Sequence, residues 1–173
     1  MAEKTITIFG TARAKPGDSA YLLAEKIGKG LAQAGYTIAN GGYGGTMTAA
    51  AKAATEQGGK TIGVTCSMFQ NSTANEYISD EIVTDSLEQR LDTLMKLGQA
   101  YVVLPGGTGT LLELAKAWEL KNKGFLKADK PIILVGKFWK PLLDLIAADD
   151  PDSIGFLLQA DTPEQVLELI TDY

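Results

Sequence analysis

A glycine-rich run that opens an amphipathic stretch carries the residues best suited to chemistry in this sequence. Three glycines let the backbone turn sharply and approach a ligand closely. The free N–H groups at the start of the following helix, expected from Leu111 to about Lys121, favour an anion. We therefore expect a phosphate-bearing ligand beside the Glu113 carboxylate. The run is Pro105-Gly106-Gly107-Thr108-Gly109-Thr110-Leu111-Leu112-Glu113, and it follows the apolar segment 100–104.

The same residues also allow a purely structural interpretation. Thr110-x-x-Glu113 matches a capping box, in which the threonine side chain caps a helix amide and the glutamate reaches back to the cap residue. A glycine-rich turn between a strand and a helix occurs in both roles. Residues 105–113 alone leave both interpretations open, and the surrounding sequence must discriminate between them.

Two further glycine-rich turns follow predicted strands, at residues 10–13 and 41–46. The carboxyl ends of parallel strands lie at one edge of a sheet, where ligands bind near the point at which the strand order reverses. We therefore expect all three turns to converge on one crevice. The candidate phosphate and nucleotide contacts are Gly10, Thr11, Arg13, Gly42, Gly44, Gly45, Thr46, Gly106, Gly107, Thr108, Gly109 and Thr110.

Arg90 is the candidate cation of the site. On the helix predicted over about 86–97, apolar residues recur at helical spacing, and Arg90 lies at the edge of their stripe. An arginine in that position is partly shielded and needs an anionic or polar partner. The alternatives are a surface pair with Glu88 or Asp92, or a reach into the crevice, because this helix directly precedes the strand that feeds the Pro105–Glu113 loop.

Composition excludes several classes of function. The chain has 173 residues, which we interpret as a single domain over 1–173, with 45% hydrophobic and 21% charged residues and a net charge of −5. That charge argues against nucleic-acid binding, and no apolar stretch approaches the roughly 20 residues of a membrane span. The N-terminus does not resemble a signal peptide. A cytoplasmic protein is expected.

The absence of histidine, together with a single cysteine, Cys66, restricts the chemistry further. Histidine-based nucleophilic triads, histidine-ligated metals and cysteine metal clusters are all excluded. Acid–base chemistry then falls to carboxylates, lysine, arginine, tyrosine or water. We expect neither a metal nor an organic cofactor.

Strand-like and helix-like runs alternate along the chain, which predicts an α/β fold. Short, continuously apolar strands indicate a parallel sheet covered on both faces, so the expected architecture is a Rossmann-like doubly wound sheet. The segment 66–79, with Met68 and Phe69, is expected to be a long loop, either a lid over a base pocket or a packed surface loop. Strands are predicted at 5–9, 37–40, 61–65, 81–84, 100–104, 132–135 and 156–160. Helices are predicted at 19–34, 46–57, 86–97, 111–121 and 139–147, with a terminal helix capped by Thr162.

The residues 105–113 fit the P-G-G-x-G-T-x-x-E signature of the LONELY GUY (LOG) family, which this sequence resembles from about Ile6 to Trp139. The turn at 10–13 is similar to the family's first turn, and residues 41–47 and 58–64 are similar to its second turn, helix and strand. The resemblance implies a cytokinin riboside 5′-monophosphate phosphoribohydrolase, which cleaves an adenine-type nucleotide into free base and ribose 5-phosphate. It also implies a homodimer or larger homo-oligomer.

By position, the resemblance makes Glu113 the catalytic carboxylate and Arg90 the arginine of the family's Arg-Lys pair. Leu91 stands where the family usually has lysine. Because of this departure, an alternative to the enzyme stays open. It is a non-catalytic binding protein for a phosphate-bearing ligand, such as a molybdenum-cofactor carrier. Dinucleotide binding is not expected, because the glycine spacing differs from G-x-G-x-x-G and no acidic residue ends the strand 61–65. Pyridoxal-dependent chemistry is not expected either, because the sequence has no recognisable Schiff-base lysine motif.

Overall fold

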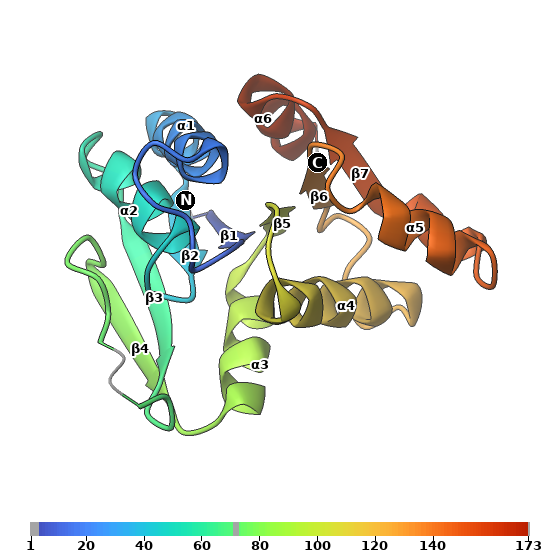
Figure 1. Cartoon of the computed structure of the whole chain (residues 1–173), viewed down its shortest axis with the longest axis horizontal. Coiled ribbons are helices and arrows are strands. Elements are labelled where there is room, and N and C mark those ends of the chain that lie inside the picture. Colours follow the sequence, from blue (N-terminus) through green and yellow to red (C-terminus); the bar gives the residue numbers. More distant parts are fainter. Residues whose placement is uncertain (1–3, 71–72, 173) are drawn as a thin grey trace.

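The computed structural model describes residues 4–70 and 73–172, and in this part of the chain seven parallel strands form one sheet (Figure 1). The order across the sheet is β4-β3-β2-β1-β5-β6-β7. This arrangement confirms the Rossmann-like doubly wound α/β fold. The strands are β1 (Thr5–Phe9), β2 (Thr37–Asn40), β3 (Thr61–Cys66), β4 (Asp80–Thr84), β5 (Ala100–Val103), β6 (Ile132–Val135) and β7 (Leu157–Ala160).

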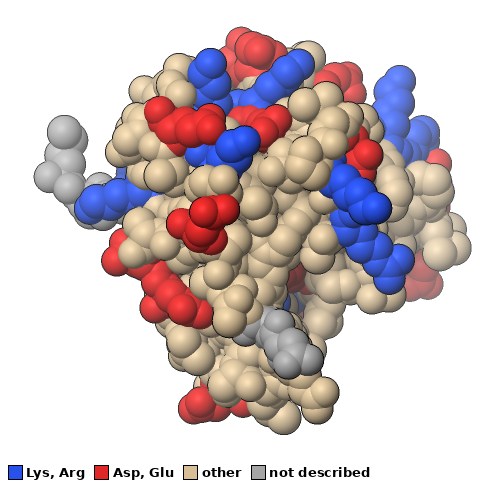
Figure 2. Space-filling model, turned by 60° about the vertical axis from the view of Figure 1, so that its left-hand side comes forward, with Lys and Arg blue, Asp and Glu red and all other residues tan. Residues whose placement is uncertain are grey.

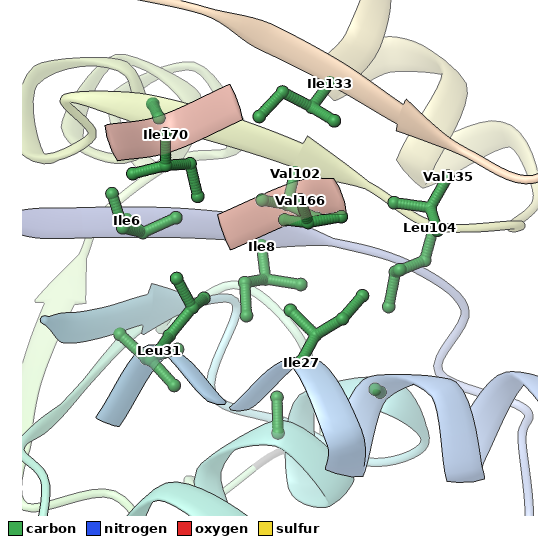
Figure 3. Packing of buried hydrophobic residues seen from close by; sticks show 14 of the residues in the cluster. Ile6, Ile8, Ile27, Leu31, Val102, Leu104, Ile133, Val135, Val166 and Ile170 are labelled. Atoms are coloured by element: carbon green, nitrogen blue, oxygen red, sulfur yellow. The ribbon is translucent and has the colours of Figure 1, made fainter. Parts of the chain in front are cut away.

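Helices cover both faces of the sheet and enclose two apolar cores. Helices α1, α2 and α6 pack over one face, where side chains of α1 and α6 meet those of β1, β5 and β6 (Figure 3). Side chains of α3, α4 and α5 pack against the other face. The helices are α1 (Ser19–Gln33), α2 (Thr46–Thr55), α3 (Leu87–Leu97), α4 (Thr108–Asn122), α5 (Lys140–Ala147) and α6 (Pro163–Thr171).

Side chains alternate along β1 and so join the two cores, as the period of a strand requires. Ile6 and Ile8 belong to the core beneath α1, whereas Phe9 belongs to the core beneath α3 and α4. Thr7 is fully buried on a central strand, and its hydroxyl donates a hydrogen bond to the Leu94 carbonyl at 3.2 Å. The central strand is therefore rigidly held from both sides.

The strand order reverses between β1 and β5. The chain moves outward from β1 to β4, then returns through α3 to place β5 on the free side of β1, with Phe9 opposite Val103. The loops after β1 and β5 therefore flank the switch point, where a doubly wound sheet opens a crevice for ligands. This confirms the convergence of the first and third turns.

Several element boundaries differ from those predicted. Helix α4 begins at Thr108, three residues before the expected start, and Asp152–Phe156 forms a 3-10 helix that delays β7 to Leu157. The helix cap expected at Thr162 is confirmed, since its side-chain oxygen accepts from the Gln165 N–H, and Ser86 caps α3 in the same way through the Gln89 N–H. The loop predicted at 66–79 includes residues 71 and 72, which lie outside the described residues. No helix in the described part is long and apolar enough to cross a membrane.

Candidate active site

The start of α4 presents backbone donors at the carboxyl edge of the sheet. Gly107 occupies the N-cap position, and the first intrahelical bond runs from the Leu111 N–H to the Gly107 carbonyl at 2.9 Å. The N–H groups of Thr108, Gly109 and Thr110 therefore precede the helical hydrogen-bond ladder. Such a helix start attracts an anion, as the sequence analysis expected.

The capping box proposed for Thr110 and Glu113 is wrong. Because the helix begins at Thr108, Thr110 lies in its first turn, and no side chain caps the helix. The buried Thr110 side chain instead packs against Gly106, where an added Cβ would overlap it. Gly106 is therefore required by close packing, and Glu113 is released from a capping role.

Hydrogen bonds join the three glycine-rich turns. Thr46 donates to the Thr11 carbonyl through its N–H at 2.9 Å and through its hydroxyl at 3.0 Å. The Thr11 N–H donates in turn to the Pro105 carbonyl at 3.2 Å. Gly45 has a φ of 63°, and a Cβ there would lie 2.5 Å from the Ala12 carbonyl carbon. The second turn therefore buttresses the first, which in turn contacts the third.

These turns enclose a cavity of about 660 Å³. Ten of the predicted site residues lie along its wall, whereas Gly42, Gly44, Gly45 and Thr46 lie in the supporting turn beside it and are not among its lining residues. A direct ligand contact for those four stays a prediction. The cavity is lined by Ile8, Phe9, Gly10, Thr11, Ala12, Arg13, Gly41, Tyr43, Met47, Arg90, Pro105, Gly106, Gly107, Thr108, Gly109, Thr110, Glu113 and Phe138.

Arg90 reaches this cavity from α3 and is only 7% exposed. Its Nε donates to the Val64 carbonyl at 2.7 Å, and its Nη2 donates to the Gly41 carbonyl at 3.3 Å. The third nitrogen, Nη1, faces Glu113 Oε1 at 3.8 Å. The guanidinium is therefore held in one orientation by the ends of two strands and is turned toward the carboxylate.

The surface alternative for Arg90 is excluded, because Arg90 is buried and faces Glu113. Asp92 pairs with Lys116 of α4 at 2.6 Å, and the hydrogen bond from this lysine lowers the pKa of the aspartate. Acidic and basic side chains are interspersed on the molecular face shown in Figure 2. Arg90 thus lies in the crevice, while the neighbouring charges of α3 interact at the surface.

Glu113 lies in the second turn of α4 and is 8% exposed. Burial raises the pKa of its carboxyl to about 7, although the Arg90 guanidinium opposes the rise. A buried carboxyl with a nearby cation titrates close to neutral pH, a common property of groups that do acid–base work. Glu113 can therefore exist in either protonation state under physiological conditions.

Eight residues that line the cavity were not predicted as site residues, among them Gly41, Tyr43, Met47 and Phe138. Tyr43 and Met47 belong to segments already identified, but their side chains showed no period that would point them at the crevice. Phe138 follows β6, the strand next to β5, and is 54% exposed at the cavity. The available signal in the sequence was an aromatic residue shortly after the apolar strand 132–135.

The described residues contain no group of three or more histidine, cysteine, aspartate or glutamate side chains placed to hold a metal ion. The cavity instead combines backbone N–H donors, a second cation in Arg13, and the Arg90–Glu113 pair. Such a set can bind a phosphate at one end and stabilise positive charge at the other.

Fold and crevice together define a Rossmann-like α/β protein with a carboxylate–arginine pair at its switch point. The chain belongs to the SLOG cluster4 family, whose model matches residues 3–167. The resemblance seen in the signature 105–113 is thereby confirmed.

The known proteins similar to this chain include cytokinin riboside 5′-monophosphate phosphoribohydrolases and molybdenum cofactor binding proteins. It is 40% identical over 116 residues to the cytokinin riboside 5′-monophosphate phosphoribohydrolase of Mycobacterium tuberculosis, covering 65% of this chain and 60% of that protein. It is 30% identical over 148 residues to the protein of that name from Rhodococcoides fascians, covering 83% and 74%. The molybdenum cofactor binding protein of Rippkaea orientalis has a TM-score of 0.80 at 27% identity, covering 99% of this chain and 98% of that one.

Proposed function

We propose that this protein hydrolyses the N-glycosidic bond of an adenine-type nucleoside 5′-monophosphate, such as AMP or a cytokinin riboside 5′-monophosphate. The products are the free base and ribose 5-phosphate. The observation that carries the proposal is the buried Arg90–Glu113 pair, 3.8 Å apart, in the same cavity as the α4 N-terminus. The names of the relatives support it, although the match spans about 60% of the length of the mycobacterial proteins.

The phosphate is assigned to the start of α4. The N–H groups of Thr108, Gly109 and Thr110 point toward this end of the helix, where the helix dipole favours negative charge. Arg13 lines the same cavity and supplies a positive charge. Binding energy from the phosphate, remote from the reacting bond, then fixes the ribose against the catalytic groups.

Glu113 is assigned to the reacting carbon. Breaking the bond between C1′ and the base nitrogen develops positive charge on the ribose ring, as in glycoside hydrolysis. An ionised carboxylate stabilises that charge and accepts a proton from the attacking water. Water supplies the new C1′–O bond, and the base leaves with the electron pair of the broken C–N bond and takes up a proton. Arg90 favours the ionised carboxylate.

A second candidate function is a non-catalytic carrier of a phosphate-bearing ligand. The observation favouring it is the similarity over nearly the whole chain to the molybdenum cofactor binding protein of Rippkaea orientalis. Leu91, the departure from the family pattern, is 5% exposed and lies outside the set of residues that line the cavity. The change at that position leaves the Arg90–Glu113 pair in place, and this supports the enzyme.

The proposal extends to assembly and location. A homodimer or larger homo-oligomer would cover Leu111 and Leu112, which are 36% and 41% exposed on α4 beside Glu113. A reducing, cytoplasmic environment agrees with the free thiol of Cys66. Light scattering on the purified protein tests the assembly, since a monomer mass would contradict it.

The direct test is incubation of the purified protein with AMP, followed by chromatography of the products. The enzyme predicts adenine and ribose 5-phosphate in equal amounts, and no release from the Glu113→Gln variant. A purified protein that carries a bound pterin and leaves AMP intact would favour the carrier.

A further inference from the structure

Two aromatic rings, those of Tyr43 and Phe69, lie close to the Arg90 guanidinium. The Arg90 Cζ is 5.4 Å from the ring centre of Tyr43 and 5.6 Å from that of Phe69. The two ring centres are 5.9 Å apart, with their planes tilted by 41°. The first two separations fall within the range of cation–aromatic attraction, and the third within the range of aromatic ring pairs.

The Tyr43 ring is anchored to the end of β3. The Tyr43 hydroxyl oxygen accepts a hydrogen bond from the Cys66 N–H at 2.8 Å. The backbone carbonyl of Tyr43 accepts from the side chains of Thr48 and Asn75, each at 2.8 Å. The ring is therefore fixed from α2, from β3 and from the segment that follows β3.

Phe69 comes from the turn directly after β3, where its N–H donates to the Cys66 carbonyl at 3.1 Å. Its side chain is 37% exposed and lies outside the set of residues that line the cavity. A contact with a ligand in the cavity is thus assigned to Tyr43 but not to Phe69. Phe69 acts on the site through what it touches, namely Arg90 and Tyr43.

The chemistry of a buried guanidinium explains why aromatic rings suit this position. The N–H donors of Arg90 lie in the guanidinium plane, where the Val64 and Gly41 carbonyls accept hydrogen bonds and Glu113 faces Nη1. The flat faces carry no N–H group, so an aromatic face offsets their desolvation without competing for a donor. An aliphatic side chain would exclude water equally well but would supply no attraction for the cation.

We propose that Tyr43 and Phe69 are positioning residues, which hold Arg90 in the orientation that places its Nη1 beside Glu113. The turn after β3 thereby contributes to the site without touching the ligand. The consequence for turnover rests on the proposed function, whereas the consequence for the Glu113 carboxyl does not. Besides Arg90 on α3, the charged side chain that shares the cavity with Glu113 is Arg13 of the first loop.

The test is the variant Phe69→Leu, which keeps an apolar side chain but removes the aromatic face. Two measurements are made: the pKa of the Glu113 carboxyl by carbon-13 NMR, and kcat and KM for AMP. We expect the pKa to rise above that of the unaltered protein, because Arg90 no longer opposes the effect of burial. We expect kcat to fall about tenfold with KM nearly unchanged, since misplacing a catalytic neighbour mainly affects the chemical step.

Two controls separate positioning from general disruption of the turn. Phe69→Tyr keeps the aromatic face and should restore both the carboxyl pKa and kcat. Met68→Ala alters the adjacent residue, which is 70% exposed, and should change neither quantity. Thermal melting of each variant shows whether it is folded.

The outcomes distinguish this inference from the proposed function. A folded Phe69→Leu protein with an unchanged Glu113 pKa would overturn the positioning role, whatever the activity. A pKa that rises in a protein that cleaves neither AMP nor isopentenyladenosine 5′-monophosphate would support the positioning role and reject the phosphoribohydrolase. Equal effects of Phe69→Leu and Phe69→Tyr would also overturn it, because the aromatic face would then be irrelevant.

Discussion

Arg90 Nη1 and Glu113 Oε1 are 3.8 Å apart, within reach of charge attraction but beyond an ordinary hydrogen bond. Both side chains are about nine-tenths buried, with side-chain exposures of 8% and 11%. The other two nitrogens of Arg90 are engaged by backbone carbonyls, so the guanidinium cannot turn away easily. The pair therefore biases the charge of the carboxylate while leaving its oxygens accessible to a water molecule or a ribose hydroxyl.

Replacing Glu113 with glutamine should abolish turnover and spare the fold. The amide keeps the size of the side chain but cannot carry negative charge or accept a proton from water, so kcat should fall by about 10² to 10⁴. Steady-state kinetics on AMP measures the loss. Binding of AMP, measured by calorimetry, should persist because the phosphate contacts lie on the first turn of α4. A variant with full activity would remove Glu113 from the mechanism.

Stability should depend on pH through Glu113 in a defined direction. Its folded-state pKa of about 7 lies above its ordinary value of 4.5, so the folded protein binds the proton more tightly than the unfolded chain. The stabilisation is complete below about pH 4.5 and is lost as pH rises through about 7. The total contribution of Glu113 protonation to the free energy of unfolding is on the order of 3 kcal/mol, at about 1.4 kcal/mol for each unit by which the pKa is raised.

Urea denaturation of the unaltered protein and of Glu113→Gln, at pH 5 and pH 8, measures this effect. The stability of the unaltered protein relative to the variant should be lower at pH 8. A difference that is independent of pH would show that Glu113 titrates at its ordinary value.

Arg90 and Glu113 should be energetically coupled in stability as well as in catalysis. Arg90→Met leaves the Gly41 and Val64 carbonyls without their charged donor and should cost about 3 kcal/mol. Part of that cost should disappear in the double variant with Glu113→Gln, because the glutamine needs no counter-charge. A double-mutant cycle by chemical denaturation should give a coupling of about 1 kcal/mol or more above pH 7. Strict additivity would show that the pair does not interact.

Two glycines of the signature should respond in opposite ways to alanine. At Gly106 a Cβ would overlap the Thr110 side chain, so Gly106→Ala should destabilise the protein by about 1–3 kcal/mol. At Gly109 a Cβ meets open space inside a helix, so Gly109→Ala should leave stability unchanged or raise it by up to about 1 kcal/mol. Its methyl group should nevertheless weaken AMP binding. Thermal melting and calorimetry on both variants test the contrast.

The architecture was predictable because each strand is short, apolar and followed by a turn or helix signal. Seven strands were placed within a residue or two, and the crevice followed from the positions of the turns after β1, β2 and β5. The start of α4 was misjudged because Thr110 and Glu113 fit a capping box by spacing. In the structure the helix begins at Thr108 and the Thr110 side chain packs on Gly106, an arrangement that the spacing of residues did not reveal.

The catalytic candidates were predictable because few residue types in this chain can do acid–base chemistry. The residues that reach the site through long-range contacts were not predictable. In a chain without histidine, Glu113 and Arg90 were the natural candidates for a carboxylate and its cation. Tyr43 and Phe69 contact Arg90 only because β3 ends beside both β2 and α3. Val64 of β3, which binds Arg90, lies 26 residues before it in the sequence. No periodicity in the sequence encodes such a meeting.

The central claim is that this cavity cleaves a nucleotide and that Glu113 does so. The most direct measurement is the amount of ribose 5-phosphate released from AMP and from isopentenyladenosine 5′-monophosphate by the unaltered protein and by Glu113→Gln. We predict multiple turnovers on at least one substrate, with free base and ribose 5-phosphate in equal amounts, and no release by the variant. Folded, unaltered protein that binds these nucleotides yet releases neither product would contradict the claim.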